Sequence, residues 1–103
     1  MRAAPPLDGS VLITGASSGI GEQTAQCFRN LFSVLAAVKM GPENVVKVNV
    51  YLTDMADFSA MNAVYATMFE QPYPARTTVA VAGLPRGARI EIEMIARRPR
   101  KKA

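Results

Sequence analysis

Two stretches near the end of the chain predict its sheet: PARTTVAV at residues 74–81 and RIEIEMIA at residues 89–96. Both are rich in β-branched residues, as strands are. Only the short Gly- and Pro-containing segment 83–87 separates them, so we expect strands at about 77–82 and 88–97 to pair as a hairpin. That pairing would place Arg76 near Glu91. A guanidinium that binds an anion beside a carboxylate that moves protons is a plausible small catalytic site.

The rest of the chain predicts a strand at 10–14, a Gly/Ser loop at 16–21, a helix from Glu22 that Gly41 and Pro42 close, a strand at 45–52, and a helix that Asp54 caps. The element order strand, helix, strand, helix, strand, strand predicts an α+β domain with a mixed sheet and two helices on one face. The expected core positions are Phe28, Leu31, Phe32, Leu35 and Val38 on the first helix, Val46, Val48, Val50 and Leu52 on the strand, and Phe58, Met61, Tyr65 and Met68 on the second helix.

The length and composition of the chain exclude several classes of function. The chain has 103 residues, which predicts one domain at 10–97 between a loose leader at 1–9 and a basic, disordered tail at 98–103. It contains no histidine, which excludes Ser-His-Asp catalysis and most zinc sites. The single Cys27 excludes an internal disulfide and fits a reducing compartment. No signal peptide or membrane span is visible, so a cytoplasmic location is the default expectation.

A glycine-rich motif, TGASSGIG, occupies residues 14–21. Over residues 10–25 the sequence resembles the opening of short-chain dehydrogenases, in which such a loop and the following helix N-terminus bind a pyrophosphate. However, no tyrosine is followed by a lysine four positions later, and the chain is too short for that family's domain. We therefore expect a turn between strand and helix, and no bound cofactor or metal.

Residues 22–96 carry a second resemblance. The segments EQT at 22–24, NVVKV at 44–48, YLTDM at 51–55, DF at 57–58, MN at 61–62, PAR at 74–76 and IEIE at 90–93 follow one another in order. Together they resemble the reactive intermediate deaminase family, also called RidA, YjgF or L-PSP. The resemblance covers nearly three quarters of the chain.

This resemblance implies a chorismate-mutase-like fold and a homotrimer with ligand sites between subunits. It also implies hydrolysis of enamines and imines, such as 2-iminobutanoate and 2-iminopropanoate, to 2-oxo acids and ammonia without a cofactor. By position, Arg76 would bind the substrate carboxylate and Glu91 would hold the attacking water or shuttle a proton. Further substrate contacts would come from Asn62, Thr78, Thr14 and Gly15, and Glu93 would belong either to the site or to the trimer interface.

Two alternatives stay open. The family's N-terminal Gly-Pro-Tyr segment, whose tyrosine lines the site, has no counterpart in this sequence, which favours a non-catalytic trimer that binds small carboxylates or acts as a chaperone. The basic tail, with five positive charges at Arg97, Arg98, Arg100, Lys101 and Lys102, would suit an RNA-acting protein of the endoribonuclease type. A solvated, disordered end is the commoner role of such a tail.

Overall fold

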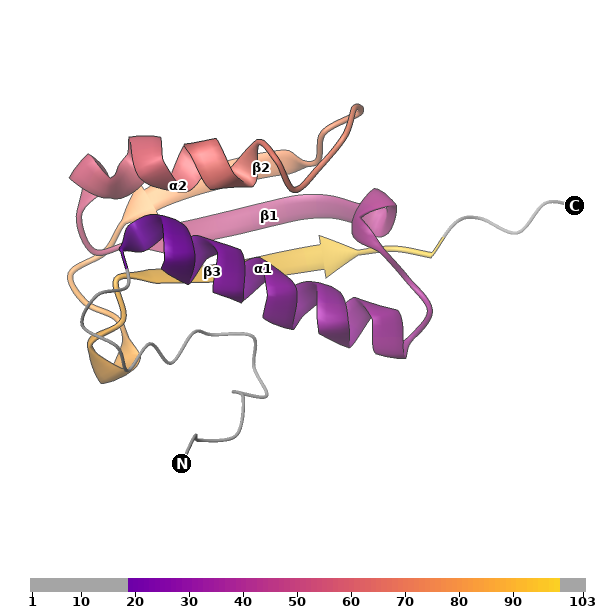
Figure 1. Cartoon of the computed structure of the whole chain (residues 1–103), viewed down its shortest axis with the longest axis horizontal. Coiled ribbons are helices and arrows are strands. Elements are labelled where there is room, and N and C mark those ends of the chain that lie inside the picture. The colour runs from indigo at the N-terminus through magenta and orange to yellow at the C-terminus, as the bar shows by residue number, and fades with distance from the viewer. Residues whose placement is uncertain (1–18, 99–103) are drawn as a thin grey trace, which may run out of the picture.

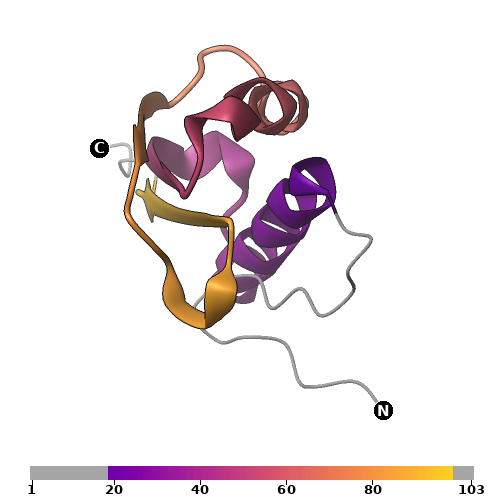
Figure 2. The ribbon, with the colours of Figure 1, turned by 90° about the vertical axis from the view of Figure 1, so that its left-hand side faces the viewer.

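The computed structural model describes residues 19–98 as a three-stranded sheet covered on one face by two helices. The helices are α1 (Ile20–Ala37) and α2 (Phe58–Tyr65), and the strands are β1 (Val45–Leu52), β2 (Ala75–Ala80) and β3 (Ile90–Ala96). Figures 1 and 2 show both helices on the same side of the sheet. The predicted α+β architecture with a mixed sheet is therefore confirmed.

The order of the strands differs from the expected hairpin. The sheet runs β2-β1-β3, so β1 lies in the middle, parallel to β2 and antiparallel to β3. Strands β2 and β3 are the two outer strands of the described sheet, and the predicted pairing of residues 77–82 with 88–97 is wrong. β1 has the most continuous apolar face, and a central position buries that face most completely.

The buried face of β1 is shifted by one residue at its start. Val45 is buried and Val46 is 42% exposed, the reverse of the expectation that Val46 shares a face with Val48. The cause is a register shift between Val45 and Lys47 opposite β3, where Val46 is the extra residue. A β-bulge of this kind resets the alternation of inward and outward side chains. The predicted inward positions Val48, Val50 and Leu52 are confirmed.

Helix α1 begins two residues before the predicted Glu22 and ends earlier than predicted. Its C-terminus is a Schellman motif, in which the Met40 N–H donates to the Leu35 carbonyl and the Lys39 N–H donates to the Ala36 carbonyl. Lys39 takes the left-handed conformation with φ +63°, whereas Gly41 has φ −141°. The expectation that Gly41 forms this cap is wrong. Val38, expected on the buried face, is 43% exposed because it already lies past the last helical turn.

An aromatic cluster joins the two helices. Phe28 is fully buried, and its ring centroid lies 5.6–5.8 Å from those of Phe32, Tyr65 and Phe69. Offset and edge-to-face rings at this spacing attract one another beyond their burial of apolar area. The cluster fixes α2 over the sheet, and α2 carries three of the residues that surround Arg76, namely Phe58, Asn62 and Tyr65. Within residues 19–98, no helix is long and apolar enough to cross a membrane.

Candidate functional site

Arg76 lies on the helix-covered face of the sheet, near the start of β2. Its neighbour across the parallel β1–β2 pair is Val48, a core residue, so the two side chains share a face. The Arg76 Nη1 atom donates a hydrogen bond of 2.5 Å to the Asn62 Oδ1 atom on α2. The structure thus brings together two of the predicted site residues.

Two aromatic rings also contact the guanidinium. Its Cζ atom lies 4.6 Å from the ring centroid of Tyr65 and 5.3 Å from that of Phe58. Both contacts are within the range of cation–π attraction. Burial raises the pKa of Tyr65, and the nearby charge of Arg76 partly opposes this effect. The guanidinium is therefore held in place by an amide and two rings, which are neutral and do not offset its positive charge.

No carboxylate neutralises Arg76 within the described part of the chain. The one ion pair within residues 19–98 joins Arg89 to Asp57 at 2.8 Å, and in the same residues the one side-chain acceptor of Arg76 is the neutral Asn62. A half-buried cation without a counterion favours binding of an anion, and a planar guanidinium is able to bind a carboxylate through two parallel hydrogen bonds.

Arg76 opens onto a cleft of about 510 Å³. Its lining residues are Asn62, Tyr65, Ala66, Tyr73, Pro74 and Arg76. The volume lies within the range of about 300–1,000 Å³ that is usual for small-molecule sites. Arg76 supplies the one charge of this lining and Asn62 an amide, and the remaining residues are apolar apart from the hydroxyl groups of Tyr65 and Tyr73.

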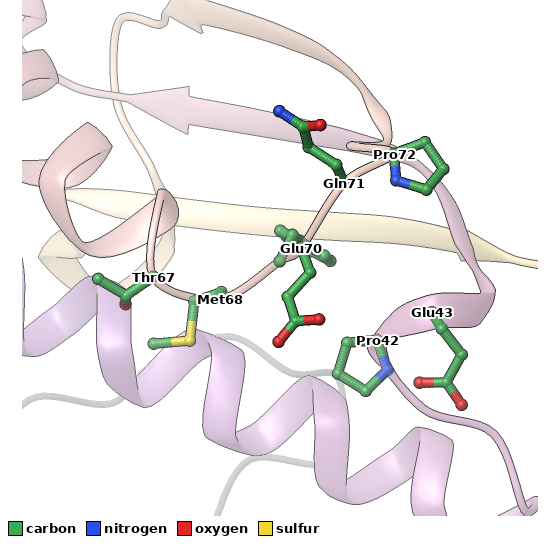
Figure 3. A pocket seen from close by; sticks show the side chains of 8 residues that line it. Pro42, Glu43, Thr67, Met68, Glu70, Gln71 and Pro72 are labelled. Carbon is green, nitrogen blue, oxygen red and sulfur yellow. The ribbon is translucent and has the colours of Figure 1, made fainter.

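A second pocket, of about 380 Å³, lies between residues 42–43 and the segment 67–72. Figure 3 shows the carboxylates of Glu43 and Glu70 on the two sides of Pro42. Its lining includes no lysine or arginine. Two carboxylates repel an anionic ligand, so this pocket suits an anion less well than the Arg76 cleft does.

Glu91 does not lie beside Arg76 as the sequence predicted. It pairs with Tyr51 across the antiparallel β1–β3 pair, on the face of the sheet that the helices leave uncovered. Arg76 points to the opposite face, and β1 separates the two strands. The expected contact within one chain is therefore wrong. The contact does not form because β1 lies between β2 and β3. The local sequences of these two strands do not encode that order.

On the same uncovered face, Glu93 takes part in a hydrogen-bond network that the sequence did not predict. Its Oε1 atom accepts from the Tyr51 hydroxyl at 2.7 Å and from the Asn49 amide at 3.0 Å. The hydrogen bond from Tyr51 is the main cause that lowers the pKa of Glu93 and raises that of Tyr51. By contrast, no hydrogen bond or ion pair of Glu91 is found within residues 19–98, so the Glu91 carboxylate remains available.

Of the other predicted substrate contacts, only Thr78 lies within the described residues. Thr78 shares the face of Arg76, and its hydroxyl is buried without a hydrogen-bond partner in the described residues, outside the lining of the cleft. Thr14 and Gly15 lie outside the described residues, as do the predicted strand 10–14, the leader 1–9 and the end of the basic tail. No cluster of potential metal ligands is present within residues 19–98.

Comparisons with known proteins identify the family of the chain. The family model for endoribonuclease L-PSP matches residues 8–98. The mitochondrial protein mmf2 of Schizosaccharomyces pombe is 50% identical over 80 residues, which cover 75% of this chain and 64% of the relative. The 2-iminobutanoate/2-iminopropanoate deaminase of Mus musculus is 46% identical over 78 residues, which cover 76% of this chain and 58% of the relative.

A solved structure, that of Escherichia coli TdcF with bound serine, superposes with a TM-score of 0.76 at 32% identity. The superposition covers 80% of this chain and 67% of TdcF. The chain spans about three fifths of the length of the curated relatives named above. No comparison supports the dehydrogenase-like interpretation of residues 10–25, and the L-PSP match extends through that segment. On the family match and these relatives together, the chain belongs to the endoribonuclease L-PSP family, whose members include the reactive intermediate deaminases.

Proposed function

We propose that this chain hydrolyses small 2-imino acids to 2-oxo acids and ammonia. One observation carries the proposal: Arg76 is held by Asn62 and two aromatic rings in an open cleft, with no carboxylate partner in the described residues. The substrate class has one carboxylate next to a C=N carbon. The name of the mouse relative, a 2-iminobutanoate/2-iminopropanoate deaminase, supports this class, and so does serine, a small amino acid, bound in TdcF.

In the proposed reaction, Arg76 binds the carboxylate and fixes the position of the adjacent imine carbon. Water adds to that carbon and forms a C–O bond. As this bond forms, the C=N π electrons move to the nitrogen, and a carboxylate accepts a proton from the water and delivers it to that nitrogen, which gives a 2-amino-2-hydroxy acid. The carboxylate then moves the remaining hydroxyl proton to the amino group, the C=O double bond forms as the C–N bond breaks, and ammonia leaves. The 2-oxo acid remains. Positioning and proton transfer supply the catalysis, and the mechanism uses no cofactor or metal.

We assign the proton transfer to Glu91 of a second copy. Within one chain, Glu91 and Arg76 point to opposite faces of the sheet, so one chain does not supply both groups to one site. A closed ring of identical subunits places one face of each subunit against a different face of its neighbour. A homotrimer, as the resemblance implies, would satisfy this requirement.

Complementation between two inactive variants tests the proposal. Arg76→Ala and Glu91→Gln are purified separately, then unfolded and refolded together. Deamination of 2-iminobutanoate is measured by its competition with semicarbazide, which traps the imine. If each site joins Arg76 of one copy to Glu91 of the next, random mixing restores about a quarter of the sites. Wild type without deaminase activity would overturn the function. An inactive mixture with active wild type would overturn the shared site.

The uncovered location of Glu91 also favours a second candidate, a protein that binds 2-oxo acids without turnover. Such a protein would need Arg76 and its cleft and would not need Glu91. Binding of 2-oxobutanoate with no deamination, unchanged in Glu91→Gln, would support it. RNA binding by the basic tail remains a prediction: deletion of residues 97–103 should abolish a strongly salt-dependent RNA affinity. The subcellular location likewise remains a prediction.

A further inference from the structure

The cleft beside Arg76 has an apolar side that binding of a carboxylate does not use. Asn62 and Arg76 form its polar corner, and the remaining lining comes from Tyr65, Ala66, Tyr73 and Pro74. With about 510 Å³, the cleft has room for more than a carboxylate and a methyl group. The apolar part of the lining would therefore determine which side chains a bound 2-imino or 2-oxo acid is able to carry.

Tyr73 is an exposed aromatic part of this apolar side. It is 57% exposed, and no hydrogen bond, ion pair or ring contact of its side chain is found within residues 19–98. A single exposed aromatic residue is common on protein surfaces. Tyr73 differs because it lines the same cleft as Arg76, three residues along the chain. A ligand that Arg76 holds by its carboxylate therefore lies within reach of an otherwise uncommitted ring.

The local sequence also restricts the backbone at Tyr73. Pro72 precedes it and Pro74 follows it. A proline disfavours the helical conformation of the residue before it and fixes its own φ angle. Tyr73 is therefore presented on a stiff segment that leads directly into β2, at Ala75. A stiff, amphipathic ring loses little conformational entropy when a ligand packs on it.

We propose that Tyr73 is a specificity-determining residue that favours 2-imino acids with branched or aromatic side chains over those with a methyl group. The inference rests on the proposed function, because it uses Arg76 to fix the carboxylate. The side chain of the ligand then packs on the Tyr73 ring, and its apolar area leaves water. The expected substrates are the imines that derive from branched-chain and aromatic amino acids.

Binding of three 2-oxo acids tests the inference without depending on catalysis. Pyruvate, 4-methyl-2-oxopentanoate and phenylpyruvate share the carboxylate and differ in the side chain. Their dissociation constants are measured by titration calorimetry for wild type, Tyr73→Ala and Tyr73→Phe. Val34→Ala, which shortens a 54% exposed apolar side chain on α1 outside the cleft, is the control.

Wild type should bind the two larger acids at least about tenfold more tightly than pyruvate, since each methylene in an apolar pocket is worth about tenfold or more. Tyr73→Ala should remove most of this preference and change pyruvate binding by less than about twofold, because the ring does not contact the carboxylate. Tyr73→Phe and Val34→Ala should keep the preference. Equal affinities for the three acids in wild type, or an unchanged preference in Tyr73→Ala, would overturn the inference.

The same variants in the semicarbazide assay, with imines of alanine, leucine and phenylalanine, separate this inference from the proposed function. A Tyr73-dependent binding preference without hydrolysis of any imine would support the specificity role and overturn the deaminase. Hydrolysis of all three imines at rates that Tyr73→Ala leaves in the same ratio would support the deaminase and overturn the specificity role. Absence of both binding and hydrolysis would overturn both.

Discussion

The substitution Asn62→Asp would test how Arg76 recognises an anion. It exchanges an amide for a carboxylate of nearly the same shape, at the atom that lies 2.5 Å from the Arg76 Nη1 atom. The new carboxylate would neutralise the guanidinium and repel an incoming carboxylate. Two carboxylates about 5 Å apart on one guanidinium repel by about 3 kcal/mol at an effective dielectric constant of about 20, and by less than about 1 kcal/mol in water.

The cleft is open, so the expected loss lies between these limits. A loss of about 1–3 kcal/mol corresponds to binding that is about 5- to 150-fold weaker. Calorimetric titration with 2-oxobutanoate measures it directly. Asn62→Ala removes the same hydrogen bond without adding a charge, and should weaken binding by about fivefold or less. Wild-type affinity in Asn62→Asp, or equal losses in both variants, would show that charge repulsion at residue 62 does not control binding of the carboxylate.

Three predictions concern the fold. Phe28→Ala removes the centre of the aromatic cluster and should lower the free energy of unfolding in urea by about 3–5 kcal/mol; a loss below about 1 kcal/mol would contradict the packing. Lys39→Gly relieves the positive φ at the end of α1 and should raise the melting temperature, with a stabilisation of about 0.5–1 kcal/mol; a lower melting temperature would contradict the assigned cap. Tyr51→Phe should destabilise the protein most between pH 4.5 and 10.0, the ordinary pKa values of Glu93 and Tyr51. The lowered pKa of Glu93 gives stability that is lost as pH falls through it, and the raised pKa of Tyr51 gives stability that is lost as pH rises through it. A destabilisation that stays constant from pH 3 to pH 12 would refute this linkage.

Within residues 19–98, local patterns predicted the helices and strands well. In residues 45–52 apolar and polar side chains alternate, as in a strand with one buried face. The buried residues Phe28 on α1 and Met61 and Tyr65 on α2 follow the helical period in the same way. The Asp54 cap was also predictable: its carboxylate accepts a hydrogen bond of 2.9 Å from the Ala56 N–H and begins the 3₁₀ turn before α2.

The order of the strands was not predictable in this way. Two strands separated by a short Gly/Pro segment usually pair, yet here the chain passes across the end of β1 before β3 begins. The Val81 N–H donates to the Leu52 carbonyl and the Thr53 N–H to the Arg89 carbonyl, so both outer strands bond to the end of the central one. Such long-range pairing depends on how the helices and the sheet pack together.

The candidate site was predicted in part. The family resemblance selected Arg76 and Asn62, which the structure brings together, although they are 14 residues apart. It also selected Glu91, but nothing in the sequence indicated that this side chain faces away from Arg76. Tyr51 and Glu93 were missed as a pair, because their contact requires the antiparallel register of β1 and β3.

We propose that Arg76 binds the carboxylate of the 2-imino acid while the C=N bond is hydrolysed. The most direct measurement generates 2-iminobutanoate with a threonine dehydratase and adds semicarbazide together with this protein. Arg86→Ala, which removes an exposed arginine from the turn before β3, is the matched control for Arg76→Ala. We predict that wild type and Arg86→Ala divert the imine to 2-oxobutanoate and that Arg76→Ala does not. Equal diversion by Arg76→Ala and wild type, or none by wild type, would contradict the claim.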